Sequence, residues 1–208
     1  MRRLMLFVVL MSASCVLAQD LKPIPLPQPQ TDGGRPLMQV LKARKTTREF
    51  AADKLPPQIL SNLLWAAFGV NRPDGRRTAP SAMNRQEIDI YVATGDGLFV
   101  YNAQANRLDP VLAQDVRAAT GTQPFPASAP LDLVYVADFA KAGSEPDADL
   151  YTAADTGFIA QNVYLYCASE GLATVVRGSV DRVALAKAMK LRPNQKIILA
   201  QTVGYPKK

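Results

Sequence analysis

Residues 149–172 read DLYTAADTGFIAQNVYLYCASEGL and form the longest helical pattern in the chain. Apolar residues recur along it with a period near 3.6 residues, as on one face of a core helix. Asp147 or Asp149 can cap its beginning, and Gly171 is a natural C-cap. An apolar run at residues 172–176 then predicts a strand. This stretch therefore predicts a long core helix that leads directly into a sheet.

Shorter patterns surround this helix. They predict helices over residues 36–43, 57–68, 112–119 and 183–189, and strands over residues 88–93, 98–101, 131–137 and 197–203. The first two strands are joined by Thr94-Gly95-Asp96-Gly97, whose Asp-Gly pair is typical of a hairpin. Helices, then a hairpin, then alternating helices and strands predict one α+β domain over residues 36–208, with its sheet covered by helices.

The first residues indicate an exported protein. Arg2 and Arg3 precede an apolar run from Leu4 to Leu10, and small residues follow up to Ala18. This pattern predicts a signal peptide over residues 1–18 and a periplasmic location. Seven continuous apolar residues are too few for a stable membrane span. Two alternatives stay open, namely lipidation of Cys15 and export by the twin-arginine route. Residues 19–35, rich in Pro and Gln, predict an extended leader.

Composition excludes several kinds of chemistry. The chain has no His, so Ser-His-Asp triads, Cys-His pairs and His-containing metal sites are excluded. Loss of the signal peptide leaves Cys167 alone, and its helical setting predicts a buried structural thiol. Loss of Arg2 and Arg3 also lowers the formal charge from +6 to +4. That mild basicity suits an anionic small ligand, and no Lys/Arg tract indicates a nucleic-acid partner.

A cationic cluster follows the first predicted helix. Arg44, Lys45 and Arg48 place three cations beside the hydroxyl of Thr46. Cations and a hydroxyl donor suit a phosphate. If the backbone is extended here, Thr46 and Arg48 point to one side, and Arg48 reaches further along the same ligand. The alternative is a solvated cluster placed at a helix C-terminus by the helix dipole.

Several segments resemble the flavin-binding signature of the nitroreductase family. Arg44-Lys45-Thr46-Thr47-Arg48-Glu49-Phe50 is similar to the family pattern Arg-Arg-Ser-x-Arg-x-Phe, and residues 80–86 are similar to Pro-Ser-x-x-Asn-x-Gln. The long helix ending in Gly-Leu and the terminal Gly204-Tyr205-Pro206 occur in the same order as in the family. The chain is most similar to the branch with azoline-forming (thiazole/oxazole) dehydrogenases. The resemblance implies a single-domain α+β fold with a central, mainly antiparallel sheet flanked by helices.

The resemblance also implies which residues bind flavin mononucleotide (FMN). It gives phosphate contacts to Arg44, Lys45 and Thr46, with Lys207 completing that site, and a contact with the pyrimidine edge of the ring to Arg48. The Pro-Ser loop contributes an amide contact from Asn84, and a backbone N–H near Glu170 and Gly171 faces flavin N5. The other members of the loop are Pro80, Ser81 and Gln86. The alternatives are ordinary ones: a turn for the loop and a frayed basic tail for Lys207.

The function implied is an FMN-dependent oxidoreductase that works in two steps, through hydride transfer to and from the flavin. Its substrate is a small organic molecule such as a nitroaromatic or a quinone. Relatives are usually homodimers with flavin at the interface. Nicotinamide donors are cytosolic, so an exported enzyme needs another donor or a substrate that reduces the flavin itself. The alternative function is an exported, flavin-free binding or scaffold protein with a degenerate form of this fold.

Overall fold

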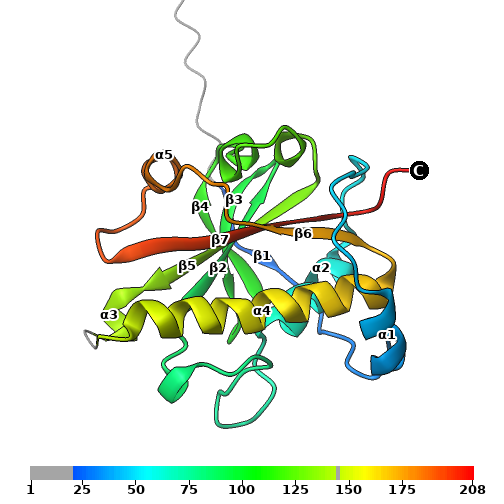
Figure 1. Cartoon of the computed structure of the whole chain (residues 1–208), viewed down its shortest axis with the longest axis horizontal. Coiled ribbons are helices and arrows are strands. Elements are labelled where there is room, and N and C mark those ends of the chain that lie inside the picture. Colours follow the sequence, from blue (N-terminus) through cyan, green and yellow to red (C-terminus); the bar gives the residue numbers. More distant parts are fainter. Residues whose placement is uncertain (1–20, 144–145) are drawn as a thin grey trace, which may run out of the picture.

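The computed structural model describes residues 21–143 and 146–208 (Figure 1). The predicted signal peptide at residues 1–18, with Cys15, lies outside these residues. Within the described part of the chain, no helix is both long and apolar enough to cross a membrane.

One seven-stranded sheet forms the centre of the molecule. Its strand order is β1-β4-β3-β2-β5-β7-β6, and every neighbouring pair is antiparallel. The strands are β1 (Ile24–Pro25), β2 (Ile88–Thr94), β3 (Gly97–Asn102), β4 (Arg107–Leu112), β5 (Leu131–Asp138), β6 (Ala173–Arg177) and β7 (Gln195–Gly204). All eight residues of β5 are buried, so the middle of the sheet is covered on both faces.

Helices lie on both faces of the sheet. They are α1 (Leu37–Ala43), α2 (Pro57–Phe68), α3 (Phe139–Ala142), α4 (Ala148–Glu170) and α5 (Arg182–Ala188). Short 3₁₀ turns occur at Ala82–Asn84, Arg117–Thr120 and Phe125–Ala127. Helix α4 crosses the front of the sheet in Figure 1, with α1 near its C-terminal end and α3 at its N-terminal end. The predicted α+β domain with a helix-covered antiparallel sheet is confirmed.

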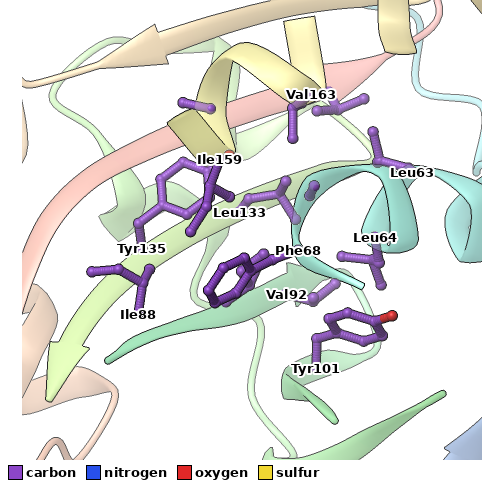
Figure 2. Close-up of a cluster of buried hydrophobic side chains, with 14 of the residues drawn as sticks. Leu63, Leu64, Phe68, Ile88, Val92, Tyr101, Leu133, Tyr135, Ile159 and Val163 are labelled. Atoms are coloured by element: carbon purple, nitrogen blue, oxygen red, sulfur yellow. The ribbon is translucent and has the colours of Figure 1, made fainter. Parts of the chain in front are cut away.

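Alternation along the strands divides the core into two layers. Ile88, Ile90 and Val92 of β2 pack with α2 and α4, whereas Tyr91 and Ala93 belong to the cluster beside α5. Such a period of two is what a strand produces, because successive side chains point to opposite faces. Figure 2 shows the α4-side layer, where side chains of α2, α4, β2 and β5 meet.

The Pro- and Gln-rich leader is extended, and it is fastened to the domain. Residues of β1 pair with β4, and Leu26 is buried in the α4-side core. Ser61 of α2 donates its hydroxyl hydrogen to the Pro27 carbonyl at 2.5 Å. The Gln30 amide donates to the Asn62 side chain at 2.9 Å. The leader therefore adds an edge strand and a strap over α2, contacts that its composition did not predict.

The helix predicted over residues 112–119 is wrong. Arg107–Leu112 instead forms β4, and only a short 3₁₀ turn follows at Arg117–Thr120. The register of β3 and β4 shifts next to the pairing of Phe99 with Pro110. Proline is tolerated in a strand at such an irregularity, and here it concealed the strand. Of the residues in the predicted helix, only Leu112 pairs with β3, and the chain is irregular from there to the 3₁₀ turn.

A buried ion pair joins β6 to β5, and the same arginine also contacts the 3₁₀ turn before β5. The Arg177 guanidinium donates to the Asp132 carboxylate at 2.7 Å, and both side chains are almost fully buried. The Thr202 hydroxyl also donates to Asp132, at 2.5 Å, and Arg177 reaches the Thr120 carbonyl at 2.5 Å. Burial raises the pKa of Asp132, and the charge of Arg177 opposes that rise.

Loss of the carboxylate at this pair should destabilise the fold. The substitution Asp132→Asn leaves the Arg177 charge buried without a counter-ion, which typically costs about 3 kcal/mol or more. Urea unfolding measures the change in the free energy of unfolding. The matched control is Asp96→Asn, which breaks the exposed Lys54–Asp96 pair and should cost less than about 1 kcal/mol. Equal losses in the two variants would contradict this assignment.

Candidate functional site

The cationic segment, residues 44–48, runs in extended form between α1 and the sheet. Its Thr47 amide donates to the Thr174 carbonyl of β6 at 3.0 Å. Just beyond it, Phe50 bridges Pro206 in antiparallel fashion. Thr46 and Arg48 are exposed on either side of half-buried Thr47, as expected for extended backbone. The segment therefore lies along the end of the sheet and not in a helix.

Tyr164 of α4 anchors this segment. Its ring lies under the Arg44 guanidinium, with 5.3 Å between the guanidinium carbon and the ring centroid. Its hydroxyl oxygen accepts from the Val176 amide at 3.0 Å and lies 3.0 Å from the Thr46 Oγ1. Tyr164 can therefore donate its own hydrogen to Thr46, which leaves the Thr46 hydroxyl hydrogen available to a ligand. Sequence reasoning missed Tyr164 because it fits the apolar period of the long helix.

The C-terminal tail brings a further cation to this place. The Lys207 amide donates to the Glu49 carbonyl at 3.3 Å, and the Ala51 amide donates to the Tyr205 carbonyl at 2.9 Å. The tail thus pairs with the segment that follows Arg48. At Gly204, a Cβ atom would stand 2.8 Å from Pro130, so close packing there requires glycine.

The charges gathered here are not neutralised within the described residues. In residues 21–143 and 146–208, Arg44, Lys45, Arg48 and Lys207 form no ion pair with a carboxylate. An anion with several oxygen atoms would satisfy this donor set.

The end of α4 lies beside the same place. Gly171 is the left-handed C-cap with φ +73°, and nothing stands within 4 Å of where its Cβ would be. A planar ligand can therefore approach its backbone closely. The Gly171 and Leu172 amides, however, both donate to the Cys167 carbonyl. The backbone donor expected near Glu170 is therefore not free in this conformation and would have to be shared.

A cavity of about 500 Å³ opens next to Glu170, which is within the usual range for small-molecule sites. The leader, α1, α2 and α4 all line it, and Trp65 and Tyr166 supply aromatic surface. Several amide side chains, including Asn62 and Asn162, add hydrogen-bonding groups. Cys167 lies nearby but is buried, and burial raises the pKa of its thiol. The predicted role of Cys167 as a structural thiol is confirmed.

The Pro80–Gln86 loop has a tightly defined shape. The Ser81 hydroxyl accepts from the Gln86 amide at 2.9 Å. Gln86 accepts from Arg77 at 2.8 Å and donates to the Asn84 side chain at 3.1 Å. Met83, Asn84 and Gln86 all have φ near +50°, which is uncommon for residues other than glycine. Gln86 therefore supports the loop, whereas Asn84 remains exposed.

This loop lies far from the cationic segment in one chain. The Ala82 amide donates to Asp155 of α4 at 2.8 Å. Asp155 precedes Glu170 by 15 residues, or about 22 Å along a helix. The structure therefore brings together Arg44, Lys45, Thr46, Arg48, Glu170, Gly171 and Lys207. It places Pro80, Ser81, Asn84 and Gln86 near the other end of α4.

Comparison with known proteins identifies the family of this chain. The nitroreductase family model matches residues 41–205, so the chain belongs to the nitroreductase family. A candidate nitroreductase of Methanocaldococcus jannaschii is 30% identical over 169 residues, covering 75% of this chain and 85% of that protein. The crystal structure of a candidate nitroreductase from Ralstonia eutropha JMP134 is 45% identical with a TM-score of 0.87. The match covers 90% of this chain and 91% of the Ralstonia chain.

More distant structures share the fold. The E. coli microcin synthetase McbBCD complex matches with a TM-score of 0.70 at 22% identity, over 77% of this chain and 68% of that one. The NADPH:FMN oxidoreductase of Vibrio harveyi matches with a TM-score of 0.64 at 19% identity, over 83% of this chain and 69% of that one. The predicted family is confirmed, and the peptide-modifying branch named with it is represented by the microcin synthetase.

Removal of the Tyr164 hydroxyl should loosen the cationic segment. In Tyr164→Phe the half-buried Val176 amide loses its acceptor, a loss of about 1–3 kcal/mol. Urea unfolding provides the measurement. Tyr151→Phe is the matched control on the same helix, because its hydroxyl has no hydrogen-bond partner among the described residues, and it should change stability by less than about 0.5 kcal/mol. A neutral Tyr164→Phe variant would show that this tyrosine does not anchor the segment.

Proposed function

We propose that this protein is an FMN-dependent oxidoreductase whose flavin is held by the cationic segment and the end of α4. The observation that carries the proposal is the group of unpaired cations at Arg44, Lys45, Arg48 and Lys207, next to the Thr46 hydroxyl. A cavity of about 500 Å³, lined by Glu170 and by residues of the leader, α1, α2 and α4, opens at the same end of α4. Membership of the nitroreductase family supports the same reading, and one structural neighbour is named an NADPH:FMN oxidoreductase.

The residues present fit the two ends of FMN. Arg44, Lys45 and Lys207 offer charge for the phosphate dianion, and Thr46 offers a hydroxyl hydrogen that Tyr164 leaves available. Arg48 lies two residues further along extended backbone, where it would meet the pyrimidine edge of the ring and favour its reduced form. When bound, the flavin supplies hydride acceptance and donation. The chain supplies binding, orientation and a fixed positive charge.

The substrate proposed is a small organic molecule, of the size of a nitroaromatic or a quinone. The cavity beside Glu170 carries aromatic surface from Trp65 and Tyr166 together with several amide groups. Such a lining suits a flat molecule with polar substituents. For an exported protein, as residues 1–18 predict, the reductant would be a donor other than cytosolic nicotinamide, or the substrate itself.

We further propose that a homodimer completes the flavin site. Leu150, Tyr151 and Phe158 form an exposed apolar stripe along α4, and exposed Met83 extends it into the Pro80–Gln86 loop. A large apolar patch of this kind is typical of a protein interface. In an isologous dimer the same surface occurs on both chains. If two α4 helices cross antiparallel near residue 162, the loop at Asp155 lies beside the partner subunit's Glu170.

This arrangement explains why one chain separates the two predicted halves of the site. Each cationic segment would receive the exposed Asn84 of the other chain, and the cavity beside Glu170 would gain a cover. A covered cavity excludes water from the flavin ring, which protects a bound hydride donor from side reactions. The two equivalent sites of the dimer would then each contain residues from both chains.

Flavin retention tests the cofactor site. The double variant Arg44→Ala, Arg48→Ala should lose bound FMN because two of the unpaired cations are gone, while circular dichroism stays unchanged. The visible absorbance of the protein, measured after incubation with FMN and desalting, reports the flavin retained. The control Lys54→Ala, Arg107→Ala removes two cations near the opposite edge of the sheet, next to β1 and β4, and should retain flavin.

Two outcomes would overturn the proposal. Unchanged flavin content in the Arg44→Ala, Arg48→Ala variant would reject the site. A wild-type protein that folds but never retains FMN would favour the flavin-free binding protein.

The interface has its own test. Phe158→Asp places a charge in the apolar stripe and removes a half-exposed aromatic ring that the interface would bury. The free energy of association should fall by at least about 1.5 kcal/mol. Sedimentation should therefore show association at least about tenfold weaker, with flavin retention falling alongside. The control is Val183→Asp, since Val183 is also exposed but lies on α5. A wild-type protein that is monomeric at every concentration would contradict the dimer.

A further inference from the structure

A buried carboxyl group that receives no hydrogen bond from another residue lies directly behind the Pro80–Gln86 loop. Glu87, the residue after the loop, is 1% exposed, and neither of its side-chain oxygens has a partner when the group is charged. Buried polar atoms almost always have partners, because an unmet carboxylate is very costly in a protein interior. The position therefore needs a proton or a ligand.

The neighbouring group is a second carboxylate. Asp155 of α4 is 3% exposed, and its Oδ2 accepts from the Ala82 amide at 2.8 Å. Asp155 also raises the pKa of Glu87, both through its charge and as a side-chain hydrogen-bond partner for the protonated form. Two adjacent buried carboxylates cannot both be charged without large repulsion, whereas one proton gives Glu87 the donor that it lacks.

We infer that Glu87 and Asp155 hold one proton between them, and that this shared proton keeps the Pro80–Gln86 loop against α4. The protonated Glu87 donates to Asp155, and Asp155 accepts from the Ala82 amide inside the loop. The loop is thus fastened at both ends, through Ala82 and through Glu87. When the proton leaves to bulk water, repulsion separates the carboxylates and the loop moves away from the helix. Glu87 and Asp155 are therefore positioning residues.

The surroundings of Glu87 support this assignment. From the loop, Arg85 is the charged neighbour, and from α4 it is Asp155. From β5 only the Asp138 amide approaches, donating to the Glu87 carbonyl at 2.9 Å, while the Asp138 carboxylate is paired with Arg192. Burial raises the pKa of Glu87 to about 7, Asp155 raises it further, and the Glu87 backbone amide and Arg85 oppose the rise.

The direction of the pH effect follows from linkage. The pKa of Glu87 in the closed loop, about 7, is above its ordinary value of 4.5. The closed loop therefore holds a proton that the open loop releases. The contribution of the pair is complete below about pH 4.5 and is lost as the pH rises through about 7. Between these values loop opening becomes more favourable by up to about tenfold per pH unit, and it levels off above them.

Hydrogen exchange at the Ala82 amide measures this opening. After correction for the intrinsic pH dependence of exchange, protection in the wild-type apoprotein should fall as the pH rises from 5 to 7 and then become constant. Glu87→Gln keeps the shape and always offers an amide hydrogen to Asp155, so its protection should not depend on pH. Asp149→Asn is the control, since Asp149 is an exposed carboxylate of the same helix, and it should behave as wild type.

A second variant and a spectrum keep the proposal falsifiable if Glu87→Gln folds poorly. Asp155→Asn keeps an oxygen acceptor for the Ala82 amide and offers an amide hydrogen to Glu87. Glu87 should therefore become charged at lower pH, and hydrogen exchange at the Ala82 amide should no longer depend on pH between 5 and 7. The infrared band of a buried protonated carboxyl group should be present in wild type at pH 5.5 and reduced in Glu87→Gln. Any contribution of Asp132 to this band is the same in both proteins, because Asp132 is not substituted. The same pH slope in wild type and Glu87→Gln, or an unchanged band, would overturn the shared proton.

A link to flavin rests on the proposed function and is tested separately. If the loop contributes to the flavin site, the dissociation constant of FMN should rise between pH 5 and 7 in wild type and stay flat in Glu87→Gln. If protection of the Ala82 amide against hydrogen exchange depends on pH while FMN affinity does not, the shared proton is supported and the loop is not part of the flavin site.

Discussion

Packing of α4 across the sheet is the constraint on which the other features depend. Ile159, Val163 and Cys167 bury one face of this helix against β5 and its neighbours, and α2 closes the layer beside it. A helix of 23 residues has a fixed length, so its two ends are held apart by about 30 Å or more. Whatever binds at one end is therefore separated from whatever binds at the other.

Each end of α4 positions one part of the candidate site. Near the C-terminal end, Tyr164 supports Arg44 and Thr46, and Gly171 leaves its backbone open to a flat ligand. Near the N-terminal end, Asp155 receives the Ala82 amide of the Pro80–Gln86 loop. The proposed two-fold partner would join these parts, and the exposed apolar residues Leu150, Tyr151 and Phe158 lie on the N-terminal half of α4. The helix would then serve as core element, spacer and interface.

Two buried acidic sites have different neighbours. Asp132 Oδ1 accepts from Arg177 and Thr202, its Oδ2 has no partner, and burial raises the pKa of Asp132 to about 7 against the opposing charge of Arg177. Glu87 receives no hydrogen bond from another residue, and burial together with Asp155 raises its pKa to about 7. The first arrangement fastens strands that lie far apart in the sequence. The second lies beside a loop in which Met83, Asn84 and Gln86 all have positive φ.

Local patterns in the sequence determined most elements, because helical and strand periods reflect which side of each element is buried. The long helix, the hairpin, the cationic segment and the family motifs could all be predicted from them. Strand β4 could not, since Pro110 hides it and only pairing with β3 makes it a strand. Nor could the strap formed by the leader, the support from Tyr164, or the meeting of Glu87 with Asp155. Those contacts join residues remote in sequence, and only the packing of α4 on the sheet decides which of them come together.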